Sequence, residues 1–198
     1  MKLYFSPTSP FSRKARIVAA MAGLDDRIEL VRADTNNPLD VLRARNPLGK
    51  IPTLERDDGV CLYDSAVICA YLDELAGGAG VIPAEREARF AALTLESLAN
   101  GIADAAILQI YEKRMRAESE YSENWIAHQR GKVDRALAAL EAAPPAPGAT
   151  HIGAIALACA LGYLDLRFDG AWRAGHPRLV AWLDSFAAAA PAFDGTRA

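Results

Sequence analysis

Cysteine and histidine are scarce in this chain, and the few that occur are not grouped. The 198 residues include three cysteines and three histidines. No pair of them has the spacing of a zinc ligand set or of a redox CxxC motif. The sequence therefore predicts no metal site. Free, buried thiols at Cys61, Cys69 and Cys159 in a reducing compartment are the simplest interpretation.

An excess of positive charge and a long apolar run are lacking as well. The net charge is −3, which disfavours proteins that bind nucleic acids or membrane surfaces through a basic patch. The charge-poor apolar run 149–163 is shorter than the roughly 18 residues that suggest a membrane span. The apolar stretch 1–5 is too short for a signal peptide. We expect a cytoplasmic protein without nucleic-acid or membrane partners.

Strand-like patterns are confined to the first part of the chain, where they alternate with helical ones. The sequence predicts strands at 1–5, 27–31, 51–55 and 60–62, and helices at 11–23, 39–46 and 65–75. A crossover unit followed by a hairpin, turning at Asp58-Gly59, predicts a mixed sheet of four strands.

After a segment rich in glycine and proline, 77–84, the chain is rich in alanine and helical in its periodicity. The sequence predicts helices at 85–115, 122–143, 152–168 and 177–190. We therefore expect an α/β domain over 1–76, a linker over 77–84 and an all-α bundle over 85–198. A cleft between two such domains is a common place for a ligand.

The first candidate site is the stretch Ser9-Pro10-Phe11-Ser12, where the first strand passes into a helix. The unpaired N–H groups and the dipole at a helix start favour a bound anion or thiolate. Pro10 suits the first helical position because its missing N–H would have no partner there. Ser9 is then either an ordinary N-cap or a ligand contact, and this stretch alone does not separate the two.

Two further stretches have the same ambiguity. Pro52, which follows a glycine turn, is a candidate for a cis peptide bond, or else a trans proline at a strand edge. The N–H and C=O of Ile51 could pair with an extended peptide. Asp64 and Ser65 begin the helix 65–75 and form either a plain cap or a carboxylate site.

Taken together, these stretches resemble the glutathione transferase family, in a bacterial-type form with serine at the start of the first helix. The most specific part is "NPLGKIPTL" followed ten positions later by "DSAVICAYL", and "LACALGYLDLR" and "HPRLVAWLDSF" are similar to the late helices of the family. The resemblance covers the whole chain. It implies a thioredoxin-like domain with a mixed four-stranded sheet, followed by a helical bundle.

The resemblance also implies roles for individual residues. The Ser9 hydroxyl would donate a hydrogen bond to the glutathione thiolate, with Thr8 and Ser12 as the next candidates for that contact and Ser6 as a further rival. Lowering a thiol pKa by about two units takes roughly 2.7 kcal/mol, which one hydrogen bond to a charged group, at about 1.5–3 kcal/mol, could supply together with the helix dipole. The other implied glutathione contacts are Lys50 for the glycyl carboxylate, Ile51 before a structural cis-Pro52 for the cysteinyl backbone, and Asp64 and Ser65 for the γ-glutamyl end.

The implied activity is conjugation of glutathione, as a cosubstrate, to a small electrophilic or apolar molecule in detoxification, with glutathione-dependent peroxidase activity compatible. No permanently bound cofactor is implied. The enzyme would be a homodimer in which Asp104 reaches the γ-glutamyl amine across the interface. Tyr111 and Ile107 would line the acceptor pocket, although Ile107 also suits core packing. A non-catalytic glutathione-binding or regulatory protein with the same fold is the alternative.

One stretch departs from the family pattern. The family begins its central bundle helix with a Ser/Thr-x-x-Asp capping box, whereas this chain has His151-Ile152-Gly153-Ala154. Both capping side chains are therefore missing, and Thr150 could act as a shifted cap. Loss of a cap costs about 0.5–2 kcal/mol, so we expect a weakened helix start.

Overall fold

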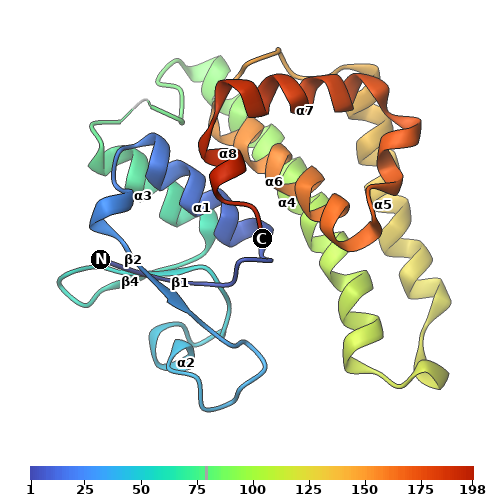
Figure 1. The fold of residues 1–198 in the computed structure, drawn as a ribbon, viewed down its shortest axis with the longest axis horizontal. Helices are drawn as coiled ribbons and strands as arrows, with labels where there is room; N and C mark the ends of the chain where they lie inside the picture. The colour runs from blue at the N-terminus through green and yellow to red at the C-terminus, as the bar shows by residue number, and fades with distance from the viewer. Residues whose placement is uncertain (79) are drawn as a thin grey trace.

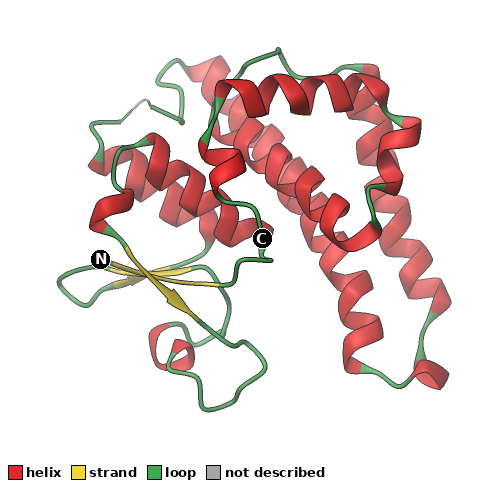
Figure 2. Cartoon of the chain, in the orientation of Figure 1, coloured by secondary structure: helices red, strands yellow, loops and turns green. Residues whose placement is uncertain are grey.

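The computed structural model describes residues 1–78 and 80–198, so Ala79, in the predicted linker, lies outside the described residues. All strands of the described chain precede residue 63, and the rest is helical (Figure 2). The predicted combination of an α/β part followed by an all-helical part is confirmed.

The α/β part is built on a mixed sheet in the order β2-β1-β3-β4. The strands are β1 (Lys2–Phe5), β2 (Glu29–Arg32), β3 (Thr53–Glu55) and β4 (Cys61–Leu62). β1 is parallel to β2 and antiparallel to β3, which is antiparallel to β4. The parallel pair requires a crossover, and the antiparallel pair β3–β4 allows a hairpin. Gly59 has φ +83° in that turn.

Three helices flank this sheet. α1 (Pro10–Met21) and α3 (Ser65–Leu75) lie side by side on one face, and α2 (Leu42–Arg45) lies on the other side (Figure 1). α2 is shorter than the predicted 39–46. The carboxylate of Asp40 accepts the N–H groups of Asp34 and Leu42, and these bonds hold the preceding residues in a turn.

The helical part contains α4 (Arg86–Met115), α5 (Glu123–Ala142), α6 (Ile152–Phe168), α7 (Pro177–Ala189) and the short α8 (Ala192–Gly195). The four long helices begin and end within one residue of their predicted bounds. By length and composition alone α4 could cross a membrane, so the expectation that no stretch meets those criteria is wrong. α4 packs along α5 and α6, as a central helix of a bundle does.

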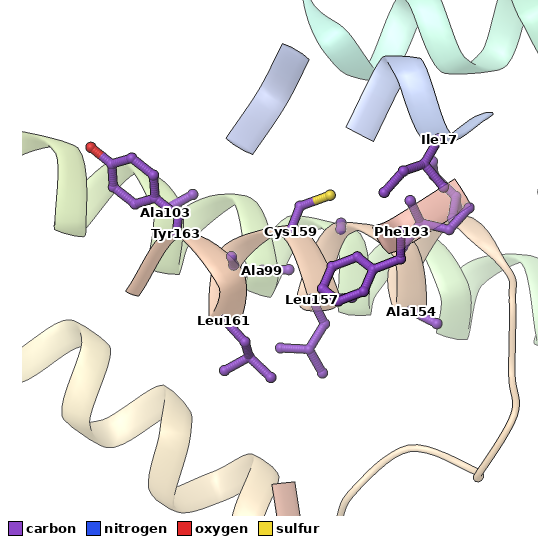
Figure 3. Packing of buried hydrophobic residues seen from close by; sticks show 14 of the residues in the cluster. Ile17, Ala99, Ala103, Ala154, Leu157, Cys159, Leu161, Tyr163 and Phe193 are labelled. Atoms are coloured by element: carbon purple, nitrogen blue, oxygen red, sulfur yellow. The ribbon is translucent and has the colours of Figure 1, made fainter. Parts of the chain in front are cut away.

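α6 forms the centre of the bundle because it is apolar on nearly every side. Cys159 points toward α1, whereas Leu157 and Leu161 point the opposite way (Figure 3). Gly153 lets α6 approach α4 closely, since a Cβ there would lie 2.4 Å from the carbonyl oxygen of Ala92.

An ion pair joins the two parts of the molecule. The Nζ atom of Lys14 in α1 lies 2.6 Å from Oε1 of Glu96 in α4, and the two side chains are only 1% and 7% exposed. Asn100 accepts a second hydrogen bond from the same Nζ at 3.3 Å. These bonds fix the position of α1, and with it the position of Ser9, relative to α4.

The start of α6 corrects one expectation drawn from the sequence. His151, not Thr150, is the N-cap, and its Nδ1 accepts the N–H of Ala154 at 3.3 Å. The preceding chain is also held, because the Ile152 N–H donates to the carbonyl oxygen of Val81 at 2.8 Å. The His151 imidazole therefore caps α6 in place of the absent Ser/Thr side chain.

The cap at His151 predicts a pH-dependent stability. Burial lowers the pKa of His151 from its ordinary value, and only the neutral ring can accept at Nδ1. The unfolded chain then takes up the proton first, so the contribution of the cap is present above about pH 6.5 and is lost as the pH falls below it. We expect His151→Ala to reduce the free energy of unfolding by about 0.5–2 kcal/mol at pH 8 and by less at pH 5.

Urea unfolding of the wild type, His151→Ala and His151→Asn at both pH values checks this prediction. Asparagine is a good N-cap that does not titrate in this range, so His151→Asn serves as the matched control. It should keep the stability at pH 8 and lose less of it than the wild type on acidification. Equal losses in the wild type and in both variants would show that the His151 cap does not contribute.

Candidate functional site

A cleft of about 780 Å³ lies between the α/β part and the helical part. One wall comes from the start of α1 and from the loops 33–36 and 49–51. The other wall comes from the second half of α4 and the end of α6. Segments from five separate places in the sequence therefore meet around one volume.

Ser9 and Thr8 both border this cleft. Ser9 is the N-cap of α1, and its Oγ accepts the N–H of Ser12 at 3.2 Å. A hydroxyl that accepts one bond can still donate its own hydrogen, so capping leaves Ser9 able to bind an anion. Ser12 is 0% exposed and is not among the described residues that line the cleft. Of the four hydroxyls considered from the sequence, the structure thus brings those of Ser6, Thr8 and Ser9 to the cleft.

The loop before β3 presents a peptide backbone to the same cleft, which Lys50 and Ile51 line. The Ile51–Pro52 peptide bond is cis. Within residues 1–78 and 80–198, neither the N–H nor the C=O of Ile51 forms a backbone hydrogen bond. These two groups can pair with an extended ligand.

A buried asparagine holds this loop, and sequence reasoning missed it. Asn46 is 1% exposed, and its Nδ2 donates to the Lys50 carbonyl at 2.9 Å and to Thr53 Oγ1 at 3.1 Å. Its Oδ1 accepts the N–H of Leu48. An asparagine directly before Pro47 is a turn signal, and that signal could have identified it.

Asp64 and Ser65 lie beside the cleft rather than in its lining. Asp64 is the N-cap of α3 and accepts the N–H of Ala66 at 2.9 Å, while Ser65 is 2% exposed. The Asp64 carboxylate nevertheless interacts electrostatically with Asp104, which lines the cleft. The pKa of Asp104 is raised above its ordinary value, mainly because the carboxyl is buried. The nearby Lys50 ammonium acts to lower this pKa, and the Asp64 carboxylate acts to raise it. These charges therefore gather at one end of the cleft.

The α4 wall carries the residues expected from the sequence at helical spacing. The expected Asp104, Ile107 and Tyr111 line the cleft from successive turns, together with Leu108, which was not expected, as positions three and four apart on a helix do. Ile107 is half-buried, and it both borders the cleft and packs against the core. The structure adds Arg114, Tyr163 and Arg167, which the sequence analysis did not identify. Arg114 follows Tyr111 by three residues and could have been found from spacing, whereas the two residues of α6 depend on tertiary packing.

Comparison with known proteins identifies the family. Residues 8–75 match the profile of the glutathione S-transferase N-terminal domain, and residues 123–185 match that of the C-terminal domain. An Escherichia coli K12 protein, the uncharacterized GST-like protein YibF, is 31% identical over 190 residues, which is 93% of each chain. The chain belongs to the glutathione S-transferase family.

Solved structures of relatives support the same assignment to the glutathione S-transferase family. A family member from Pseudomonas fluorescens Pf-5, solved with bound glutathione, is 43% identical with a TM-score of 0.91, covering 99% of this chain and 98% of that one. A second structure of a family member from that strain holds S-(propanoic acid)-glutathione, at 43% identity and a TM-score of 0.88, covering 100% and 98% of the two chains. The thioredoxin-like domain and helical domain of this glutathione S-transferase fold agree with the predicted architecture.

The cysteines of this glutathione S-transferase family member lie away from the cleft. Cys69 and Cys159 are buried, and burial raises the pKa of each thiol to about 12. Cys61 is half-buried on β4, so the prediction that all three thiols are buried is wrong for this residue. Because β4 is a two-residue strand, it leaves Cys61 only partly covered. None of the cysteines in the described chain borders the cleft.

Proposed function

We propose that this protein is a glutathione transferase that binds glutathione in the cleft and stabilises its thiolate with the hydroxyl of Ser9. The observation that carries the proposal is that Ser9, at the start of α1, and Ile51, before the cis-Pro52, border one cleft. Glutathione in the structure of the Pseudomonas fluorescens relative supports this ligand. The first helical turn favours an anion at this position.

The ligand is a tripeptide with charged ends, and the site offers groups for each part. The peptide groups of Ile51 would pair with the cysteinyl backbone, which directs the sulfur toward Ser9, with Thr8 as the rival hydroxyl. Lys50 would bind the glycyl carboxylate, and Asp64 and Ser65 would bind the γ-glutamyl end. Glutathione is the cosubstrate in this proposal, which needs no permanently bound cofactor.

The reaction we propose is nucleophilic attack by the bound thiolate on an electrophilic molecule. A carbon–sulfur bond forms, the leaving group departs with its electron pair, and the thiol proton passes to solvent. The protein contributes orientation and stabilisation of the anion. S-(propanoic acid)-glutathione in a Pseudomonas fluorescens relative supports a site that holds a glutathione S-conjugate. Glutathione-dependent reduction of organic hydroperoxides is compatible with the same thiolate.

The two parts of the chain would have different functions in this reaction. Residues 1–76 would form the glutathione-binding domain, 77–84 the linker, and 85–198 the domain that supplies the acceptor pocket through Ile107 and Tyr111. We place this activity in cytoplasmic detoxification. The alternative, a non-catalytic glutathione-binding or regulatory protein, keeps the same binding site and differs in the thiol chemistry.

We also infer a homodimer formed through the outer face of α4 and α5. This face has a groove of about 630 Å³ with mostly apolar lining. Phe90 and Leu98 border it and are 60% and 39% exposed. Exposed apolar side chains gathered in one groove are typical of an interaction surface. In such a dimer Asp104 would lie close enough to the interface to reach the γ-glutamyl amine bound by the partner.

Removing the Ser9 hydroxyl should reduce conjugation without abolishing glutathione binding. We expect Ser9→Ala and Ser9→Gly to lower kcat/KM at pH 7 by about ten- to a hundredfold, because a hydrogen bond to a charged group contributes about 1.5–3 kcal/mol. Glycine keeps the cap to within a few tenths of a kcal/mol, so Ser9→Gly separates loss of the donor from loss of the cap. Steady-state kinetics with 1-chloro-2,4-dinitrobenzene and calorimetric glutathione binding measure both effects.

Thr8→Ala is the matched control, and it should change kcat/KM by less than about threefold if Ser9 is the principal donor. A large loss of kcat/KM in Thr8→Ala, with no loss in Ser9→Gly, would show that Thr8 is the principal donor. Tight glutathione binding without conjugation in the wild type would favour the non-catalytic alternative. Absence of glutathione binding would contradict the proposal altogether.

The dimer predicts a particle of twice the chain mass of 21.2 kDa in sedimentation velocity. Phe90→Asp should shift it toward the monomer, since a charge in an apolar interface is desolvated without a partner. Leu39→Asp is the matched control, because Leu39 is 90% exposed elsewhere on the surface. A monomeric wild type at micromolar concentration would contradict this interface.

A further inference from the structure

The cleft face of α4 separates opposite charges along its length. Asp104 stands at one end of this face, within electrostatic reach of Lys50 and Asp64. Arg114 lies ten residues further along the same helix and also lines the cleft. At 1.5 Å per residue the two positions are about 15 Å apart along the axis. The end with Asp104 belongs to the glutathione contacts proposed above, so Arg114 marks the other end.

A second arginine reaches this far end from α6. Arg167 and Tyr163 both line the cleft and are one helical turn apart. The guanidinium carbon of Arg167 lies 5.7 Å from the Tyr163 ring centre, and that of Arg114 lies 5.6 Å from the Tyr111 ring centre. Burial raises the pKa of Tyr163, while both guanidinium groups lower it. The two arginines and two tyrosines therefore form one group.

Neither arginine of this group is neutralised by a carboxylate. Within the described chain, neither Arg114 nor Arg167 forms a salt bridge, and the Nε of Arg167 is buried without a hydrogen-bond partner. Arg173, by contrast, donates twice to Asp165 at 2.8 and 2.6 Å. The acidic residues that border the cleft are Asp104, at the opposite end, and Asp34, which accepts the N–H of Asn36.

Position at a helix end does not account for this arrangement. Both arginines occupy the last turn of their helices, where a cation interacts favourably with the dipole. That effect requires only a positive charge in the last turn. It does not require that two cations from different helices face one cleft, or that the Nε of one be buried without an acceptor.

We propose that the second substrate is an anionic electrophile whose carboxylate binds Arg167 and Arg114 and whose apolar body packs against Tyr111 and Tyr163. A planar guanidinium suits a carboxylate because it can donate two parallel hydrogen bonds. This inference rests on the proposed function, since it names the class of molecule that the glutathione thiolate would attack. In water such an acceptor is repelled by the thiolate. The two arginines would offset that repulsion.

A pair of probes that differ only in charge tests the inference: 4-chloro-3-nitrobenzoate and its neutral amide. In each case the thiolate sulfur bonds to the ring carbon that carries chlorine, chloride leaves with the bonding electrons, and the thiol proton goes to solvent. Each kcat/KM is divided by the uncatalysed rate constant for the same probe. We expect the wild type to favour the benzoate by about tenfold or more, with a KM for the benzoate that rises with added salt.

Substitutions of individual arginines test which residues cause the preference for the benzoate over its amide. Arg167→Gln should lower kcat/KM for the benzoate by about tenfold, mainly through KM, and leave the benzamide within about twofold. Arg114→Gln should have a smaller effect of the same kind, because Arg114 is more exposed. Arg167→Lys should retain part of the preference. Arg130→Gln, which removes an exposed charge outside the cleft, should change neither probe. Retained glutathione affinity shows that each variant is folded.

The dissociation constants of the two S-aryl glutathione conjugates separate recognition from turnover. Tighter binding of the carboxylate conjugate by the wild type, lost in Arg167→Gln, supports the anion site even in the absence of turnover. Selective binding of the carboxylate conjugate without turnover of either probe would overturn only the proposed conjugating activity. Equal affinity for the two conjugates, or equal losses for both probes in Arg167→Gln, would overturn the anionic acceptor and leave the glutathione transferase proposal intact.

Discussion

The buried ion pair between Lys14 and Glu96 is the constraint on which the rest of the site depends. Its Nζ–Oε1 distance is 2.6 Å and its side chains are 1% and 7% exposed. Because an unpaired charge at this depth would cost several kcal/mol, α1 and α4 must keep a fixed relation. Ser9 begins α1, and α4 carries the cleft face from Asp104 to Arg114. This one buried ion pair therefore fixes the two walls of the cleft relative to each other.

The cleft combines segments that have no local reason to meet. α1 provides a helix start whose capping hydroxyl, on Ser9, accepts one hydrogen bond and can still donate its own hydrogen. The loop held by Asn46 provides the peptide groups of Ile51, which form no backbone hydrogen bond within the described residues. The last two turns of α4 and of α6 provide two tyrosines and two arginines at the opposite end. Each device is ordinary by itself: an N-cap, a loop before a strand, a cation near a helix end. Their convergence around a cleft of about 780 Å³ is what the proposed binding of a tripeptide thiol, with a second molecule beside its sulfur, requires.

Much of the fold could be predicted because the decisive signals are local. The long helices follow from periodicity and from proline and glycine at their ends, and the mixed sheet follows from a crossover unit plus a hairpin. The short α8, the imidazole cap at His151 and the half-buried Cys61 could not be predicted, since each depends on contacts or coverage that a pattern does not encode. Among the candidate site residues, Ser9 and Ser12 both carry hydroxyls at the start of the first helix, so either could contact a ligand. Only the direction in which α1 faces the core separates a buried hydroxyl from one at the cleft. Arg167 was missed for the same reason.

The proposed function requires this cleft to hold bound glutathione as its thiolate at neutral pH. The most direct measurement is the ultraviolet absorbance of the thiolate of protein-bound glutathione as a function of pH, with Ser9→Gly alongside. We expect the pKa of the bound thiol to lie about two units below the value of about 8.5 of a free thiol, and most of this shift to be lost in the variant. A bound thiol that titrates like free glutathione, or a shift of equal size in both proteins, would contradict the proposed thiol activation.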